Sequence, residues 1–203
     1  MTDSDMQKYA DLMMEVKNRI SSIDFLLTRK GHALFKATTI ESVALQMRKV
    51  LELIAFGSLV ANKQKYSAAY EKFASHWNAR LMLRDLETVN PDFYPQPMIE
   101  VPTSDPKAVH QLKERQPDYL TEDEFEKVYE KCGALLHASN PYGSQVDYAY
   151  YVKCLPQWRN QILNLLNNHK IKLVGETIFY LVHMKEERDE KVHFYKFGPM
   201  PPQ

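Results

Sequence analysis

Residues 41–60 read ESVALQMRKVLELIAFGSLV, and this stretch decides the expected fold because apolar residues cover most of one helix's circumference. At about 100° per residue, steps of seven and four return nearly to the same face, so Glu41, Arg48 and Glu52 lie along one stripe. Much of the remaining surface is apolar and includes Ile40, Ala44, Met47, Leu51 and Ile54. Such a helix is typical of the centre of a helical bundle.

The charged stripe on this helix needs partners, because burying an unpaired charge is costly. We interpret Glu41, Arg48 and Glu52 as a structural ion pair that fixes the register of the helix. The alternative is that the carboxylates hold Arg48 ready to bind a phosphate group.

The composition limits the class of protein. The chain has 203 residues, enough for a full core, and we expect a single domain over residues 1–203. Basic and acidic residues both number 26, so no overall field attracts nucleic acid or a membrane surface. The N-terminus lacks the pattern of a signal peptide, and no apolar run could span a membrane. We expect a cytoplasmic protein without membrane association.

Cys132 and Cys154 are the two cysteines, and they do not have the spacing of a zinc site. We expect two reduced thiols that pack as small apolar groups. No glycine-rich phosphate loop or nucleophile elbow is present, so the sequence predicts no cofactor and no metal.

Three helices are expected in the first 90 residues. The first carries an apolar seam in steps of three and four and ends at Gly31; the seam consists of Met6, Tyr9, Met13, Val16, Ile20, Ile23 and Leu27. The second begins at Thr38 or Thr39. The third covers about residues 67–89, and its buried side carries Tyr66, Tyr70, Phe73, Trp77 and Leu81.

Residues 91–119 contain six prolines and little periodicity, which predicts a long loop. A connection of this length is uncommon in a compact domain and is often functional. Its apolar residues favour an arm lying on the surface; these are Phe93, Tyr94, Met98, Ile99 and Val101.

A fourth helix begins at a capping box, in which Thr121 and Glu124 bond each other's backbone amides and Leu120 packs on Phe125. The fifth shows apolar steps of four and three from Tyr151 to His169, with Pro156 in its first turn or at a kink.

Residues 171–198 alternate with the period of strands around a charged turn, which predicts a β-hairpin. The expected fold is therefore mainly α: an antiparallel bundle of about five helices with a C-terminal β-hairpin. If the turn is centred on Arg188, His183 and His193 lie opposite each other; a cross-strand aromatic pair is favoured over a metal site.

Two groups of residues are candidates for binding phosphate. Lys72, His76, Arg80 and Arg84 step by four along the third helix and form a basic edge, although such a run is usually a solvated helix face. His137 ends the segment KCGALLHASNP, where the helix dipole favours its charged form. The same placement also serves simply to cap the last helix carbonyls.

The segments RKVLELIAFGSLV and KCGALLHASNP, together with the long first helix, resemble the HEPN superfamily of helical bundles. This resemblance implies dimerisation and a role in prokaryotic defence or toxin systems, often as a metal-independent ribonuclease. The family's catalytic signature is an arginine followed four to six residues later by histidine. His137 matches the histidine, and Lys131 stands six residues earlier with the charge of the arginine but not its planar fork.

The expected function is therefore RNA or nucleotide binding by a homodimer. Arg48, His76, Arg80 and Arg84 are the expected phosphate ligands. If RNA is cleaved, the mechanism these residues suggest is 2′-hydroxyl attack assisted by His137, with Lys131 stabilising phosphate charge. The alternative is a non-catalytic interaction module that holds a protein partner through the 91–119 arm or the hairpin.

Overall fold

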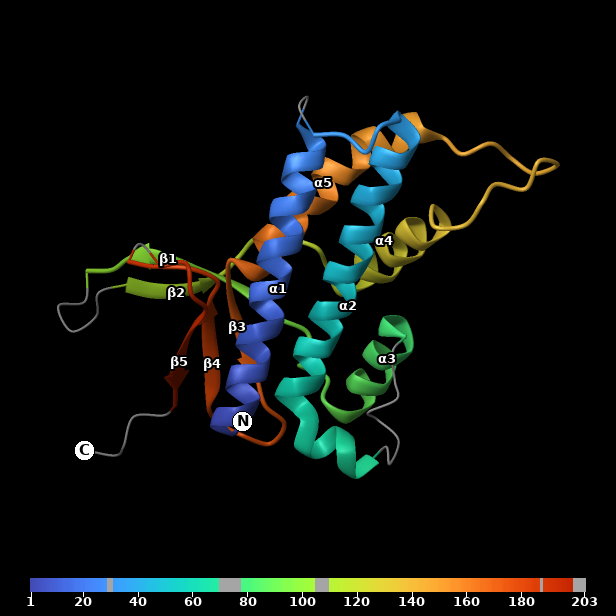
Figure 1. Ribbon diagram of the computed structural model, residues 1–203. Helices are drawn as coiled ribbons and strands as arrows, with labels where there is room; N and C mark the ends of the chain where they lie inside the picture. The colour runs from blue at the N-terminus through green and yellow to red at the C-terminus, as the bar shows by residue number, and fades with distance from the viewer. Residues whose placement is uncertain (29–30, 70–77, 105–109, 187, 199–203) are drawn as a thin grey trace, which may run out of the picture.

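The computed structural model describes residues 1–28, 31–69, 78–104, 110–186 and 188–198. Its helices are α1 (Asp3–Leu27), α2 (Lys36–Ala69), α3 (Ala79–Val89), α4 (Glu122–Ala134) and α5 (Tyr148–Leu166). Its strands are β1 (Gln96–Pro102), β2 (His110–Glu114), β3 (Asn168–Lys172), β4 (Phe179–His183) and β5 (His193–Phe197). Figure 1 shows the helices gathered on one side of the sheet.

The expectation of a mainly α-helical bundle with a lone C-terminal hairpin is wrong. The strands form one antiparallel sheet in the order β2-β1-β3-β4-β5. Helices account for 56% of the described residues and strands for 16%. The fold is therefore a mixed α/β fold in which a helical layer packs on a sheet.

The predicted 91–119 loop supplies two of these strands, β1 and β2, which pair from Met98 opposite Glu114 to Pro102 opposite His110. Proline argues against a central strand because it cannot donate a ladder hydrogen bond. Here β1 pairs with β3 only at Gln96 and Pro97, so the loss is confined to a short ladder. The prediction of a loop from the prolines of this segment is therefore wrong over β1 and β2.

The predicted hairpin is present as β4 and β5, and His183 pairs with His193 as the expected turn requires. It is not isolated, because β3 precedes it and pairs with β4 along its whole length. The sequence analysis placed His169 on the fifth helix, whereas it lies in β3. The helix spacing of Ile162, Leu165 and His169 continues by coincidence across the helix end at Leu166.

The central position of α2 is confirmed, because its residues are buried on several sides; Ile40, Val43, Ala44, Met47, Val50, Leu51 and Ile54 are among them. The seam of α1 is buried at Tyr9, Met13, Val16, Ile20 and Ile23. One hydrophobic cluster runs from these helices to Ile171, Tyr180 and Val182 of the sheet.

The third helix is shorter than expected, because α2 continues through Tyr66 to Ala69 and α3 begins only at Ala79, capped by Asn78. Leu81, expected on the buried side, is exposed. Lys72, His76, Tyr70, Phe73 and Trp77 lie outside the described residues.

The capping box at α4 is confirmed, since the Thr121 hydroxyl accepts from the Glu124 amide and the Glu124 carboxylate accepts from the Thr121 amide. Leu120 and Phe125 beside it are fully buried. Pro156 lies inside α5 and beyond its first turn, so of the two positions expected for it the first turn is excluded. Cys132 and Cys154 are free, and burial raises the pKa of Cys132 to about 12.

A buried hydrogen bond joins α1 to the sheet. The Tyr9 hydroxyl lies 2.7 Å from Nε2 of His169, and Nδ1 of His169 lies 2.7 Å from the carbonyl oxygen of Leu166. Because a carbonyl only accepts, Nδ1 carries the proton and Nε2 accepts from the tyrosine. Burial lowers the pKa of His169 to about 4, so the imidazole is neutral at pH 7.

This neutral histidine makes folding sensitive to acid. The unfolded chain binds a proton at His169 near the ordinary pKa of about 6.5, whereas the folded protein binds it only near pH 4. The buried neutral imidazole therefore contributes fully to the unfolding free energy above pH 6.5. About 3 kcal/mol of this free energy is lost as the pH falls to 4. We expect His169→Gln to have a flatter dependence of unfolding free energy on pH, measured by urea titration between pH 7 and pH 4.

The matched control is His137→Ala, because His137 is exposed and its loss leaves the buried pair intact. This variant should follow the wild-type dependence. Parallel curves for wild type and His169→Gln would show that the buried imidazole does not set the acid sensitivity.

Candidate binding surfaces

Arg48 connects α2 to α4 through Tyr129. Its guanidinium carbon lies 3.8 Å from the centroid of the Tyr129 ring, and Nη2 donates to the tyrosine hydroxyl at 2.6 Å. Nη1 donates to the Tyr129 carbonyl at 3.2 Å, and Nε lies 3.4 Å from the Glu52 carboxylate. The tyrosine hydroxyl in turn donates to Glu52 at 3.4 Å. All three guanidinium nitrogens therefore face groups of the protein itself.

Gly133 makes room for this arrangement on α4. A Cβ atom at this position would lie 2.3 Å from Nη1 of Arg48, well inside the contact distance of two atoms. Glu41 does not take part, because its carboxylate accepts from the Tyr148 hydroxyl of α5 at 2.7 Å. The predicted stripe is thus divided: Arg48 pairs with Glu52, and Glu41 connects α2 to another helix.

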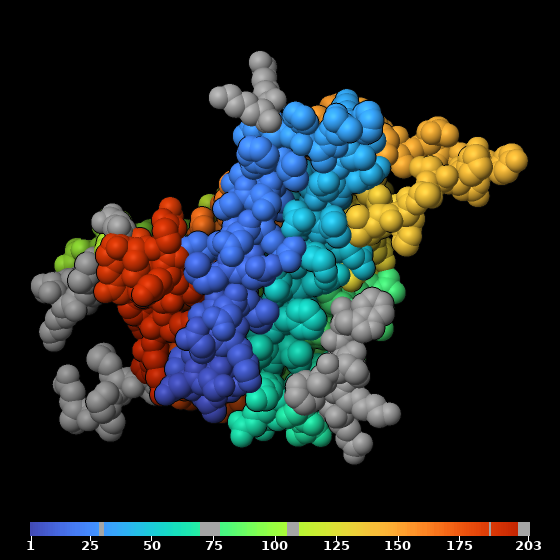
Figure 2. Space-filling model, viewed as in Figure 1, coloured from blue at the N-terminus to red at the C-terminus, as the bar shows by residue number. Residues whose placement is uncertain are grey.

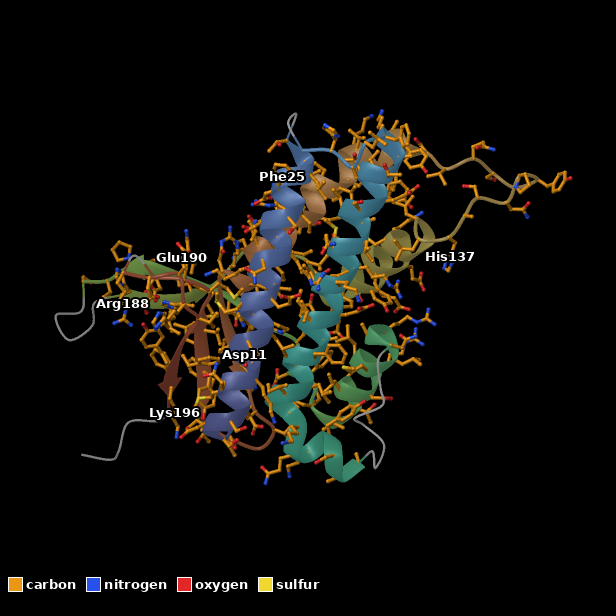
Figure 3. The ribbon with its side chains drawn as sticks, in the orientation of Figure 1. Asp11, Phe25, His137, Arg188, Glu190 and Lys196 are labelled. Atoms are coloured by element: carbon orange, nitrogen blue, oxygen red, sulfur yellow. The ribbon has the colours of Figure 1, made fainter. Side chains whose placement is uncertain are left out.

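Lys131 and His137 lie at and beyond the C-terminal end of α4, and both side chains are exposed. The Lys131 ammonium lies 5.6 Å from the centroid of the Tyr150 ring. His137 follows the helix cap at Leu135, at the base of the loop that projects in Figure 3. Neither side chain has an ion-pair partner within the described residues.

The predicted basic edge faces an acidic helix. Arg80 Nη1 lies 2.6 Å from Glu130 and 3.3 Å from Glu126, and Arg84 Nη2 lies 3.0 Å from Glu126. The cleft between α3 and α4 has a volume of about 490 Å³. Three cations line it, Arg80, Arg84 and Lys127, against five carboxylates, Glu87, Glu122, Asp123, Glu126 and Glu130. This surplus of carboxylates disfavours a phosphate site, and His76 lies outside the described residues.

The two faces of the sheet differ. Residues paired across antiparallel strands share a face, so His169, Val182 and Phe194 lie together on the inner face. The inner face packs on the helices through Tyr9, whose ring centroid lies 5.8 Å from that of Phe194. We call the opposite side the outer face; by register it carries Gln96, Met98, Glu100, Leu112, Glu114, Lys170, Lys172, Phe179, Leu181, His183, His193, Tyr195 and Phe197.

The outer face combines aromatic residues with balanced charge. The rings of Phe179 and Phe197 stack with their centroids 5.1 Å apart, and the ring centroids of His183 and Tyr195 are 5.0 Å apart. Tyr195 and Phe197 are exposed, whereas Leu181 beside them is buried without belonging to the main hydrophobic cluster. The lysines and glutamates on this face are Lys170, Lys172, Glu100 and Glu114. The outer face therefore presents exposed aromatic residues together with two charges of each sign.

The hairpin histidines do not form a metal site with any third ligand, and within the described residues no group of histidine, cysteine or acidic side chains is arranged to hold a metal. Nε2 of His193 lies 2.7 Å from Asp189, and Nε2 of His183 lies 3.2 Å from Glu100. Likewise, none of the described helices has the length and apolar character to cross a membrane.

Comparison of the chain with protein-family models, curated proteins and solved structures finds no match. The resemblance to the HEPN superfamily therefore stays an expectation from the sequence. The outer face was missed by sequence reasoning because two of its five strands, β1 and β2, come from the arm that was expected to be a loop. The signal that could have identified it is the alternation in residues 98–101. In a strand, Met98 and Glu100 lie on one face and Ile99 and Val101 on the other, which predicts a strand despite the prolines.

The contact of Gly133 with Arg48 gives a test of this link between helices. In wild type, Gly133→Ala should lower the unfolding free energy by about 1–2 kcal/mol, because the methyl group displaces the guanidinium. In an Arg48→Met background the same change should raise it by up to about 1 kcal/mol, because alanine favours helix over glycine. Urea unfolding of the four proteins measures the difference.

Gly143→Ala is the control, because its Cβ atom would lie 3.4 Å from the nearest atoms, those of Asn140, an ordinary contact. It should behave alike in both backgrounds. The same effect of Gly133→Ala with and without Arg48 would refute the contact.

Proposed function

We propose that the protein is a non-catalytic interaction module that forms a homodimer through the outer face of its sheet. The observation that carries this proposal is that the arm and the hairpin, the two segments expected to hold a partner, belong to one sheet. Their strands together build the outer face, with Tyr195 and Phe197 exposed on it. Exposed aromatic residues are enriched in protein interfaces.

The charges of the outer face favour a protein partner over nucleic acid. The outer face carries two lysines and two glutamates, and Lys172 lies 2.5 Å from Asp92, so no positive surplus remains for a phosphate backbone. A symmetric dimer places the same patch on both partners, and a patch with charges of both signs can pair with its own copy. The formal net charge of zero adds no long-range repulsion between copies.

Sedimentation of the protein at tens of micromolar tests the dimer. We expect the wild type to sediment as a dimer and Phe197→Glu to sediment as a monomer, because the substitution places like charges opposite each other in an apolar interface. Phe197 is exposed at an edge strand, so the variant should keep the wild-type far-ultraviolet circular dichroism.

Tyr142→Glu provides the control, because Tyr142 is 98% exposed in the loop after α4, away from the sheet. It should remain dimeric. A monomeric wild type, or a Phe197→Glu variant that dimerises as well as the wild type, would remove the proposal.

RNA binding in a defence or toxin context is the second candidate function. It is favoured by the exposure of Lys131 and His137 near one end of α4, where neither has an ion-pair partner among the described residues. Lysine and charged histidine both donate hydrogen bonds to phosphate oxygens. The Arg48 guanidinium and the α3 arginines support it less, because carboxylates already pair with them.

The double substitution Lys131→Ala with His137→Ala tests this candidate. If these side chains contact phosphate, binding of a single-stranded RNA should weaken with added salt in the wild type and be lost in the double variant. Fluorescence anisotropy at two salt concentrations measures binding, and gel analysis of the same samples detects cleavage. Equal binding by both proteins, or none by either, would rule this site out.

A further inference from the structure

A second apolar surface lies where α1 ends and α2 begins, beside α5. A pocket of about 350 Å³ is present there, which we call the apical pocket. Buried core residues line it, among them Ile40, Val43 and Leu155, and exposed residues line it as well, among them Leu27, Leu34, Phe35 and Val152. Phe25, labelled near the end of α1 in Figure 3, is 60% exposed.

The turn before α2 holds two of these apolar side chains toward solvent. Leu34 is 78% exposed and has a φ of 66°, a backbone conformation that costs a leucine about 1–2 kcal/mol. The amide of Ala33 donates to the Thr39 hydroxyl at 2.8 Å, and the amide of Phe35 donates to the Thr38 hydroxyl at 3.2 Å. The turn is thus fixed by hydrogen bonds in a form that exposes Leu34 and Phe35.

Pro156 adds a polar acceptor beside the pocket. Because proline has no amide hydrogen, the carbonyl of Val152, four residues earlier in α5, cannot receive the usual helical hydrogen bond from position 156. Val152 is itself exposed and lines the pocket together with Pro156.

Among the described residues, Lys36 is the one charged side chain that lines the apical pocket, and no carboxylate does. His32 also lines it, with Nδ1 accepting from the Leu34 amide at 3.3 Å. Asp24 on α1 is already paired, since both of its carboxylate oxygens accept from Arg159, at 2.7 and 2.5 Å. The surroundings favour an anionic partner.

We infer that the apical pocket binds an acidic amphipathic segment of a partner protein, with leucine or phenylalanine anchors in the pocket and a carboxylate facing Lys36. The apolar floor supplies affinity through burial of the anchors, and Lys36 selects the charge of the segment. This pocket is separate from the outer face of the sheet, so a dimer formed through that face leaves both pockets open.

The experiment is a selection from a displayed library of random 12-residue peptides against the wild-type protein, with counter-selection against Phe35→Ser with Val152→Glu. Both substituted residues are exposed, so the variant should keep the wild-type unfolding midpoint. We expect the enriched peptides to combine two or more large apolar residues with aspartate or glutamate. A synthetic copy of the most enriched peptide is then titrated by fluorescence anisotropy.

In this titration the dissociation constant should rise by about tenfold or more for the pocket variant. It should also rise for Lys36→Glu and with added salt, because the lysine attracts the carboxylates. Tyr142→Ala should bind as the wild type does. Enrichment of basic or uncharged peptides, binding that survives in the pocket variant, or no enrichment over that variant would each overturn the inference.

Two further measurements distinguish a peptide ligand from two other possible occupants of this pocket, a second copy of the chain and a membrane. Phe35→Ser with Val152→Glu should leave sedimentation unchanged, because the dimer proposed above uses the sheet; a change would mean that a second copy covers the pocket. Co-sedimentation with vesicles containing phosphatidylserine should show no binding that depends on these residues. Binding of that kind would assign the surface to an anionic membrane and contradict the peptide.

Discussion

The architecture depends on the need to cover α2 on almost every side. This helix is apolar over so much of its surface that it is stable only when surrounded, and α1, α3, α4 and α5 all contribute to that cover. The space-filling view shows α1 lying along α2 over much of its length (Figure 2). Because the described helices pack around α2, they cover the inner face of the sheet and leave its outer face open.

The sequence predicted the elements that follow a single local rule. The seam of α1, the central place of α2 and the Thr121 capping box all depend on residues within a few positions of one another. The register of His183 with His193 likewise followed from one turn. The sheet could not be derived in this way, because β1 and β3 pair through only Gln96 and Pro97, some 70 positions from their partners.

The partners of the charged residues could not be predicted from the sequence for the same reason, because they come from distant parts of the chain. Helix spacing correctly places Arg80 and Arg84 on one edge, but spacing within α3 says nothing of Glu126 and Glu130 on α4, which pair with them. Arg48 was placed correctly beside Glu52, whereas its contact with Tyr129 depends on how two helices meet at Gly133. Periodicity locates charges on a face; tertiary packing decides whether those charges are available to a ligand.

The hydrogen bond between Tyr9 and His169 also has a consequence for synthesis of the chain, since its partners are 160 residues apart. At about 5–20 residues per second, a ribosome needs roughly 8–30 s to make the intervening segment. During that interval α1 can pack against α2, but the Tyr9 hydroxyl lacks its hydrogen-bond acceptor, the imidazole of His169. The N-terminal helix therefore reaches its final set of contacts only after translation of the last strands, and the emerging chain carries an incomplete face that a ribosome-associated chaperone could bind.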